Sequence, residues 1–454
     1  MSRRWKRTAL LVAAAALSMV LMAAPAGARP SEVDGVQRTQ SHTLNIYGLG
    51  GRDDVAQGRL DIANAVIRGL GHSVNNPVAG FNNQAFLARL AARDIPDLVH
   101  MGRGDIGTYA ARGALVPLGS CFRNENIDRN AYRKAALAEV TYKGQLYGAP
   151  EFTNQITIIV NNDAARKAGV NTADIQTTNW KRLKQANKKL LQITNGRLTR
   201  IGFDPKIPEF FPLWVKWFGK DLISKNGLKA QLNTRESVAA LAYTVGLIND
   251  HGGWNRFKAF RDTWDFFGRN NQVAADQVGA WPMESWYYNV LAEGAPVNLT
   301  AKYFTNRKGG PITMLSGNAW AIPKGSKNPG LACKYIKALQ SVDAWKRVAK
   351  ERFDLRKRQG RAFTGLYTGN AQADVKIYED IYQPMGNKDF DDAVALLTRA
   401  PRYAFAVPLS PASTEFKQAW TDAINRVLEG RQTPRQALDQ AQREAQAAID
   451  RAKS

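Results

Sequence analysis

Aromatic residues with polar neighbours are the most frequent potential binding groups in this chain of 454 residues. The segment Trp281–Trp286 reads Trp-Pro-Met-Glu-Ser-Trp, with a carboxylate between two indoles. Sugar rings have apolar faces and a rim of hydroxyls, so a sugar site needs flat aromatic rings together with amide or carboxylate groups. A tryptophan can equally serve the core. The aromatic residues that suggest such a site are Trp214, Trp217, Trp254, Trp264, Trp281, Trp286, Tyr287, Tyr288 and Trp320.

Patterns typical of catalytic and metal sites are not found in the sequence. There is no Gly-x-Ser-x-Gly elbow and no phosphate-binding P-loop motif. The four histidines, His42, His72, His100 and His251, are far apart and form no His-Glu-x-x-His motif, so a zinc centre has no support. Glycosidase carboxylates have no local motif, so a secreted glycosidase stays open as an alternative. We therefore predict no catalytic residue, no metal ligand and no cofactor.

A strand, a glycine loop and a helix follow one another near residue 50. Leu44–Tyr47 alternates like a short strand, Gly48–Gly51 forms the loop, and Val55–Leu70 has helical spacing. Asp53 stands where a dinucleotide-binding fingerprint would have its third glycine, so nucleotide binding is not predicted. The order of elements predicts an α/β lobe.

The rest of the chain continues this alternation. The length exceeds that of one compact core, so we expect two domains or two interleaved lobes. Thr433 followed by Pro434 predicts the start of a last helix. Apolar spacing predicts further helices over residues 86–93, 180–191, 237–248, 331–339 and 416–428, and strands over 98–101 and 201–203.

The first 28 residues have the pattern of a secretory signal. Basic residues precede an apolar run from Thr8 to Met22, and Ala26–Ala28 is a small-residue cleavage site. The run is short for a membrane span, and no cysteine near the cleavage site could carry a lipid anchor. We expect a cleaved signal peptide over 1–28 and a periplasmic protein, with the general secretory and twin-arginine routes both open.

The chain is strongly basic, with a formal charge of +24. Cleavage after residue 28 removes four basic and no acidic residues, which leaves +20. Three interpretations compete: nucleic-acid binding, binding of acidic small molecules, and a basic solvated surface. The export signal argues against nucleic acid, and outside 352–361 the basic residues are dispersed, which favours a solvated surface and leaves an acidic ligand open. A cell-surface adhesin for polyanions is a further alternative, whereas a polyamine fits this charge poorly.

Two segments resemble motifs of a known family. Residues 142–170 contain Tyr-Lys-Gly-Gln-Leu-Tyr-Gly-Ala-Pro-Glu-Phe, a β-branched run and Val-Asn-Asn-Asp, which reads as a strand that leaves one sheet and enters another. Residues 316–329 read Ser-Gly-Asn-Ala-Trp-Ala-Ile-Pro-Lys-Gly-Ser-Lys-Asn-Pro. Both resemble the extracellular solute-binding proteins of ABC sugar importers (family 1, similar to maltose-binding protein). This resemblance implies an α/β, two-lobed periplasmic-binding-protein fold of type II, with a hinge of three crossings.

The resemblance also implies domain boundaries. The first lobe would comprise residues 29–153 and 314–356, and the second lobe residues 154–313 and 357–454, with crossings near 153, 313 and 356. Cys121 and Cys333, the two cysteines of the chain, would then lie in the first lobe. An oxidising periplasm would allow them to form a disulfide, and two buried thiols are the alternative.

The ligand site implied by the resemblance lies between the lobes. The family has a sugar-stacking tryptophan at the position of Trp286, whereas Glu209 replaces an aromatic contact and Asn154 replaces a carboxylate of the maltose binder. With Arg52 and Arg103, these replacements would suit an acidic sugar or a sugar phosphate, because arginine forks match carboxylate and phosphate. The ligand-binding residues expected on this basis are Gly51, Arg52, Arg103, Asp105, Asn154, Glu209, Phe210, Trp214, Glu284, Trp286, Gly317, Asn318 and Trp320.

The function implied is capture and delivery without catalysis. The lobes would close over a carbohydrate, and the closed monomer would dock on the transmembrane subunits of an ABC permease. No nucleic acid and no cofactor are expected as partners. The alternatives are a secreted glycosidase and a binding protein for a non-sugar anion or a metal ion.

Overall fold

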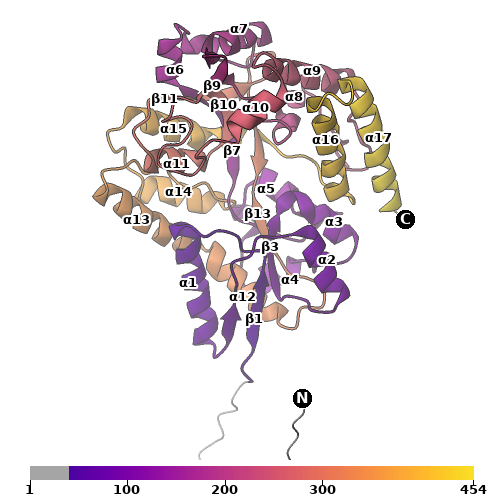
Figure 1. Cartoon of the computed structure of the whole chain (residues 1–454). Helices are drawn as coiled ribbons and strands as arrows, with labels where there is room; N and C mark the ends of the chain where they lie inside the picture. The colour runs from indigo at the N-terminus through magenta and orange to yellow at the C-terminus, as the bar shows by residue number, and fades with distance from the viewer. Residues whose placement is uncertain (1–39, 454) are drawn as a thin grey trace, which may run out of the picture. The chain divides into compact units, whose positions relative to one another are not determined.

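Two main β-sheets organise residues 40–453, which are the residues that the computed structural model describes (Figure 1). The first sheet has the strand order β2-β1-β3-β13-β6, and the second has the order β14-β12-β11-β7-β10-β9-β8. Residues 41–453 belong to one compact unit, within which we call each sheet with its helices a lobe. The α/β class is as predicted, whereas the predicted signal peptide, residues 1–28, lies outside the described residues.

The first lobe is built mainly from the N-terminal third of the chain. Figure 1 shows α1 and α12 side by side along its sheet. Its elements are β1 (Thr43–Tyr47), α1 (Asp54–Gly69), β2 (Ser73–Asn75), α2 (Asn83–Ala91), β3 (Leu98–Gly102), α3 (Ile106–Ala111), α4 (Gly119–Asn124), α5 (Lys134–Ala138), β4 (Thr141–Tyr142), β5 (Gln145–Leu146), β6 (Ala149–Pro150), β13 (Asn318–Ala321) and α12 (Pro329–Gln340).

The second lobe surrounds β7, whose β-branched residues are almost all buried at the centre of the larger sheet. Its elements up to the return crossing are β7 (Asn154–Asn161), α6 (Asn162–Lys167), α7 (Trp180–Leu190), β8 (Gln192–Thr194), β9 (Arg197–Phe203), α8 (Phe211–Lys216), α9 (Arg235–Asn249), α10 (Trp254–Arg261), β10 (Val278–Glu284), α11 (Tyr287–Glu293), β11 (Leu299–Thr305) and β12 (Pro311–Ser316).

The C-terminal segment supplies helices to both lobes. A third apolar cluster packs α1 of the first lobe against two of these helices, through Val55, Trp345 and Ile377. The last two helices pack on α9. Thr433 is the N-cap of the final one, as predicted, and it also forms a capping box with Gln436. The elements are α13 (Val342–Arg358), α14 (Ala371–Asp380), α15 (Lys388–Arg399), β14 (Ala404–Phe405), α16 (Ser413–Leu428) and α17 (Pro434–Arg451).

Two crossings between the sheets run side by side. The chain leaves the first sheet after β6 and enters the second at Asn154, and it returns between Ser316 of β12 and Asn318 of β13. Asn154 pairs with Ser316, and the Glu151 N–H donates to the Asn318 carbonyl at 2.9 Å. The segment after α13 lies against them, because the Thr153 N–H donates to the carbonyl of Tyr367 at 2.9 Å. These strands form the hinge region of the fold.

The strongly periodic segments are helices and strands where predicted. The helix predicted over 180–191 is α7 (Trp180–Leu190), and its start is fixed by Asn179, whose side chain accepts from the Arg182 N–H. None of the helices within residues 40–453 is long and apolar enough to cross a bilayer.

Cys121 of α4 and Cys333 of α12 form a disulfide inside the first lobe, with their Cα atoms 5.6 Å apart. The bond joins residues 212 positions apart, so it removes freedom from the unfolded chain. We expect its reduction to lower the free energy of unfolding by about 2–4 kcal/mol. Urea unfolding with and without reductant measures this difference. Two reactive thiols per chain in the denatured, unreduced protein would contradict the bond.

Candidate ligand-binding site

A cavity of about 1310 Å³ lies between the two sheets and is lined by both lobes. The first lobe contributes the loop around Gly51 and the segment 102–105, which follow β1 and β3. The second lobe contributes residues 283–286 at the end of β10, and the hinge strands provide Asn154 and 316–318. Loops after the carboxyl ends of strands are where α/β sheets bind ligands. The volume exceeds the usual range of about 300–1,000 Å³ for small-molecule pockets.

The structure brings nearly all of the predicted site residues together around this cavity. Phe210 and Trp320 line it but are almost fully buried, so they present little surface to a ligand. The predicted residues that line the cavity are Gly51, Arg52, Arg103, Asp105, Asn154, Glu209, Phe210, Glu284, Trp286, Gly317, Asn318 and Trp320.

Trp214 is the exception, and its assignment to the site was wrong. It lies on α8 with no exposed surface, and its indole N–H donates to the Pro205 carbonyl at 2.9 Å. Its ring packs edge-on against Phe304, with 5.0 Å between the centroids. Trp214 is therefore a core residue of the second lobe.

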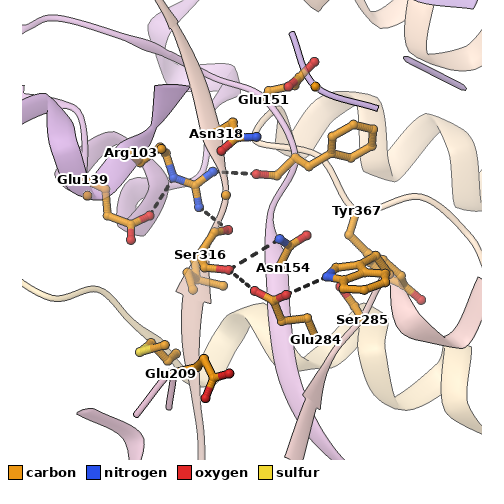
Figure 2. A pocket seen from close by; sticks show the side chains of 18 of the residues that line it. Arg103, Glu139, Glu151, Asn154, Glu209, Glu284, Ser285, Ser316, Asn318 and Tyr367 are labelled. Atoms are coloured by element: carbon orange, nitrogen blue, oxygen red, sulfur yellow. Dashed lines mark hydrogen bonds and ion pairs between the residues drawn. The ribbon is translucent and has the colours of Figure 1, made fainter. Parts of the chain in front are cut away.

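Arg103 is fully buried beside the hinge, and its guanidinium points into the protein (Figure 2). Nε donates to Glu139 at 2.7 Å, Nη1 to the Phe152 carbonyl at 2.5 Å, and Nη2 to the Ser316 carbonyl at 2.6 Å. Burial raises the pKa of Glu139, and Arg103 opposes this shift. Arg103 thus bonds to both crossing strands. Each of its three guanidinium nitrogens already donates to a protein oxygen, so it presents no free pair of donors to an anion.

Gly317 makes this arrangement possible. Its φ of +150° is unusual for other residues, and a Cβ there would lie 2.2 Å from the Phe152 carbonyl oxygen and 2.4 Å from Nη1 of Arg103. The glycine of the second crossing is therefore required by packing against the first.

A second buried arginine, Arg59 of α1, forms an ion pair with Glu151 of the first crossing. His100 of β3 contacts the other carboxylate oxygen of Glu151. The Arg59 guanidinium also lies 3.8 Å from the ring centroid of Trp345. Although burial by itself raises the pKa of Glu151, Arg59 and His100 outweigh it and hold this pKa well below its ordinary range. Sequence reasoning missed all of these residues, because they are brought together only by the fold.

Glu284 at the end of β10 connects the hinge strands to Trp286, an aromatic residue of the cavity lining (Figure 2). One carboxylate oxygen accepts from the Ser316 hydroxyl, and the other accepts from the indole N–H of Trp286 at 2.6 Å. The Asn154 amide donates to the Ser316 hydroxyl at 3.4 Å. These contacts fix the orientation of the Trp286 ring, which lines the cavity while packing partly on the core.

Another wall carries a charged cluster around Lys206. Its ammonium lies 3.8 Å from Glu209, which is also 3.4 Å from Arg261, and Arg261 lies 3.3 Å from Asp204. Burial lowers the pKa of Lys206. Burial raises that of Glu209, but Lys206 and Arg261 reverse the shift and lower it. The half-exposed Glu209 therefore presents an ionised carboxylate to the cavity.

The remaining arginines at the site also have protein partners. Arg52 donates to the Asn76 carbonyl, and Arg352 donates to Asp53 at 2.7 Å and also contacts Asp54. Asp105 accepts from the Thr414 hydroxyl at 3.0 Å. The cavity lining includes six Lys and Arg and seven Asp and Glu residues, a formal charge of −1 in a basic protein. Within residues 40–453, no group of three His, Cys, Asp or Glu side chains could hold a metal ion.

The fold and the interlobe cavity define a solute-binding protein. Residues 82–352 match the family model described as bacterial extracellular solute-binding protein, and the chain belongs to this family. The chain is similar to the arabinooligosaccharide-binding protein of Bacillus subtilis (strain 168), with 24% identity over 271 residues. That match covers 58% of this chain and 60% of the length of the relative.

Solved structures with the same fold cover nearly all of the described chain. The structure titled CpMnBP1 with mannobiose bound is 22% identical, has a TM-score of 0.72, and is matched over 89% of this chain and 100% of its own. The maltose/maltodextrin-binding domain MalE of Bdellovibrio bacteriovorus bound to maltotriose is 16% identical, with a TM-score of 0.65, over 90% of this chain and 100% of its own. These similarities show the two-lobed fold.

Proposed function

We propose that this protein captures a neutral oligosaccharide between its two lobes and delivers it to an ABC permease. The observation that supports this most is an interlobe cavity lined by an oriented aromatic ring, Trp286, and by hydrogen-bonding groups of Asn154, Glu209 and Glu284. Stacking against the ring would hold the face of a sugar, and the polar groups would bind its hydroxyls.

The charges of the site favour a neutral ligand over an acidic one. Arg52, Arg59, Arg103 and Arg352 line the cavity, but each already donates to a carboxylate or a carbonyl of the protein. An anion would compete with these protein partners and would face a lining with a formal charge of −1. The arginines therefore support the walls, and the acidic sugar suggested by the sequence is no longer the favoured ligand.

The size of the cavity favours a chain of several rings over a single ring. Its 1310 Å³ is larger than the usual small-molecule site. Similar proteins include an arabinooligosaccharide-binding protein and proteins whose structures hold mannotriose or maltotriose, which agrees with an oligosaccharide.

The proposed mechanism is closure around the hinge strands, which buries the ligand between the lobes. Residues 1–28 would direct export and be cleaved off. The mature protein would act as a monomer in the periplasm and dock in its closed form on the transmembrane subunits of the permease. It would release the sugar unchanged, and chromatography of the sugar after long incubation tests this against a glycosidase. A shortened sugar would refute capture without catalysis.

A thermal-shift screen of linear mono- to pentasaccharides, uronic acids and sugar phosphates tests the ligand class. We expect at least one neutral oligosaccharide to stabilise the protein, by about 2.7 kcal/mol at 100 times its dissociation constant. The matched acidic sugars should give smaller shifts at equal concentration. Tighter binding of a uronic acid or phosphorylated sugar than of its neutral counterpart would contradict the neutral assignment.

A further inference from the structure

Phe267 is the most exposed large hydrophobic side chain within residues 40–453, with 74% of its surface accessible. It also lines the cavity between the lobes. Single exposed apolar residues are ordinary on protein surfaces, but an aromatic ring at the wall of a binding cavity can bind ligand. Phe267 is therefore a candidate for contact with the ligand.

The Phe267 ring extends the aromatic surface of Trp286. The two rings are stacked with 5.8 Å between their centroids and 18° between their planes. Trp286 is held in turn by the hydrogen bond from its indole N–H to Glu284 at 2.6 Å. Because the two rings stack, one face of Phe267 lies against Trp286, and its exposed outer face adds a second aromatic surface to that of Trp286; we call the two rings together the platform.

The turn that carries Phe267 is fixed on both sides, although its side chain is exposed. The Phe266 carbonyl accepts from the Tyr287 hydroxyl at 2.8 Å, and the Gly268 N–H donates to the Asp265 carbonyl at 2.9 Å. A Cβ at Gly268 would lie 1.7 Å from the exposed Asp265 carboxylate, so a larger residue there would have to displace that side chain. Phe267 thus lies in a loop that is held by internal hydrogen bonds, so less conformational entropy of the loop is lost when a ligand binds.

Polar groups lie near this platform. Phe266 is in ring contact with Phe267 at 4.9 Å, and Lys206 lies 5.7 Å from the Phe266 ring. Glu209 is 3.8 Å from Lys206 and is half-exposed. The half-exposed Glu209 carboxylate lines the same cavity and could accept from a sugar hydroxyl, whereas the Lys206 side chain is almost fully buried.

We propose that Phe267 is an outer sugar subsite that sets the preference for chain length. An inner ring of the oligosaccharide would lie against Trp286, and one further ring would lie on Phe267. This inference rests on the proposed carbohydrate function and adds to it the residue that distinguishes longer from shorter chains. Stacking of one more ring is expected to raise affinity about tenfold, in the range of ordinary aromatic contacts in binding sites.

Calorimetric titration with linear manno-, malto- and arabino-oligosaccharides of two to five rings tests the subsite. In the wild type, affinity in the series that binds best should rise about tenfold at one added ring. Phe267→Ala should remove this step and leave shorter chains within about twofold, and Phe267→Trp should restore it. Tyr403→Ala, which removes another exposed ring that is not part of the cavity lining, is the matched control and should leave the length profile unchanged.

Two outcomes would overturn the subsite. Equal loss of affinity for all chain lengths in Phe267→Ala would mean that Phe267 only supports Trp286. An unchanged length profile in Phe267→Ala would exclude an effect of this ring on ligand length. If no oligosaccharide binds the wild type, the proposed function fails and this inference fails with it. That result differs from one in which oligosaccharides bind but affinity does not change with the number of rings.

Discussion

Replacing Trp286 with alanine is expected to weaken binding of the oligosaccharide by about thirty- to a thousand-fold, or about 2–4 kcal/mol. The substitution removes the flat face that lines the cavity and the indole N–H that orients Glu284. Because Trp286 is only partly buried, most of the fold should survive the change. Calorimetric titration and a melting curve on the same sample separate the loss of affinity from any loss of stability.

Trp254→Ala is the matched control for Trp286. Trp254 is a partly buried tryptophan of the same lobe that stacks on Phe257, with 6.1 Å between the centroids, and does not line the cavity. It should lower the melting temperature and leave affinity unchanged. The stacking role is wrong if Trp286→Ala behaves in the same way as this control.

Replacing Glu151 with glutamine is expected to lower the free energy of unfolding by about 3–5 kcal/mol at pH 7. Glu151 is the carboxylate partner of Arg59, and both side chains are almost completely buried. Glutamine keeps the shape but leaves the Arg59 charge unpaired inside the protein. Urea unfolding at several pH values measures the difference.

The pH dependence of this difference has a definite sign. The pKa of Glu151 in the folded protein lies below its ordinary 4.5. As pH falls through 4.5, the unfolded chain therefore binds more protons than the folded protein does. The stability that Glu151 contributes is present above pH 4.5 and is lost progressively below it, so the gap between wild type and variant should narrow in acid.

Glu351→Gln is the control for this pair. Glu351 is exposed and bonds to Arg347 at 3.0 Å one helical turn away, an arrangement worth about 0.5 kcal/mol or less. A Glu151→Gln variant as stable as this control, or a gap that widens in acid, would contradict the role given to the buried pair.

Local sequence patterns predicted the elements well because they depend on nearby residues. The strand predicted over 44–47 is β1 (Thr43–Tyr47), and the helix predicted over 55–70 is α1 (Asp54–Gly69). Alternation and helical periodicity follow directly from which face is buried. The start of α17 was predicted from Thr433 and Pro434 for the same reason, since capping involves residues only three positions apart.

The roles of single side chains at the site were harder to predict. Trp214 and Trp286 are both tryptophans near polar residues, yet one is core and the other lines the cavity. Arg103 was expected to face a ligand, but Glu139 and two hinge carbonyls, all distant in sequence, bind its guanidinium. Burial and long-range partners decide both cases, and neither is encoded in local spacing.

Phe267 is a residue that sequence reasoning missed although a signal was present. Phe266-Phe267-Gly268 places two aromatic rings in a turn within a mainly polar stretch, outside any predicted helix or strand. Two adjacent aromatic residues in a turn cannot both face the core easily, so one of them was a candidate for the surface. Its place beside Trp286 required the fold.

A crystal structure of the protein with the neutral oligosaccharide that stabilises it most tests the proposed binding mode directly. We expect one sugar chain in the cavity between the lobes, with a ring stacked on Trp286 and hydroxyls bonded to Asn154, Glu209 or Glu284. Arg52, Arg59, Arg103 and Arg352 should keep their present protein partners. A sugar bound outside this cavity, or inside it with Arg103 turned away from Glu139 to bind the ligand, would contradict the account.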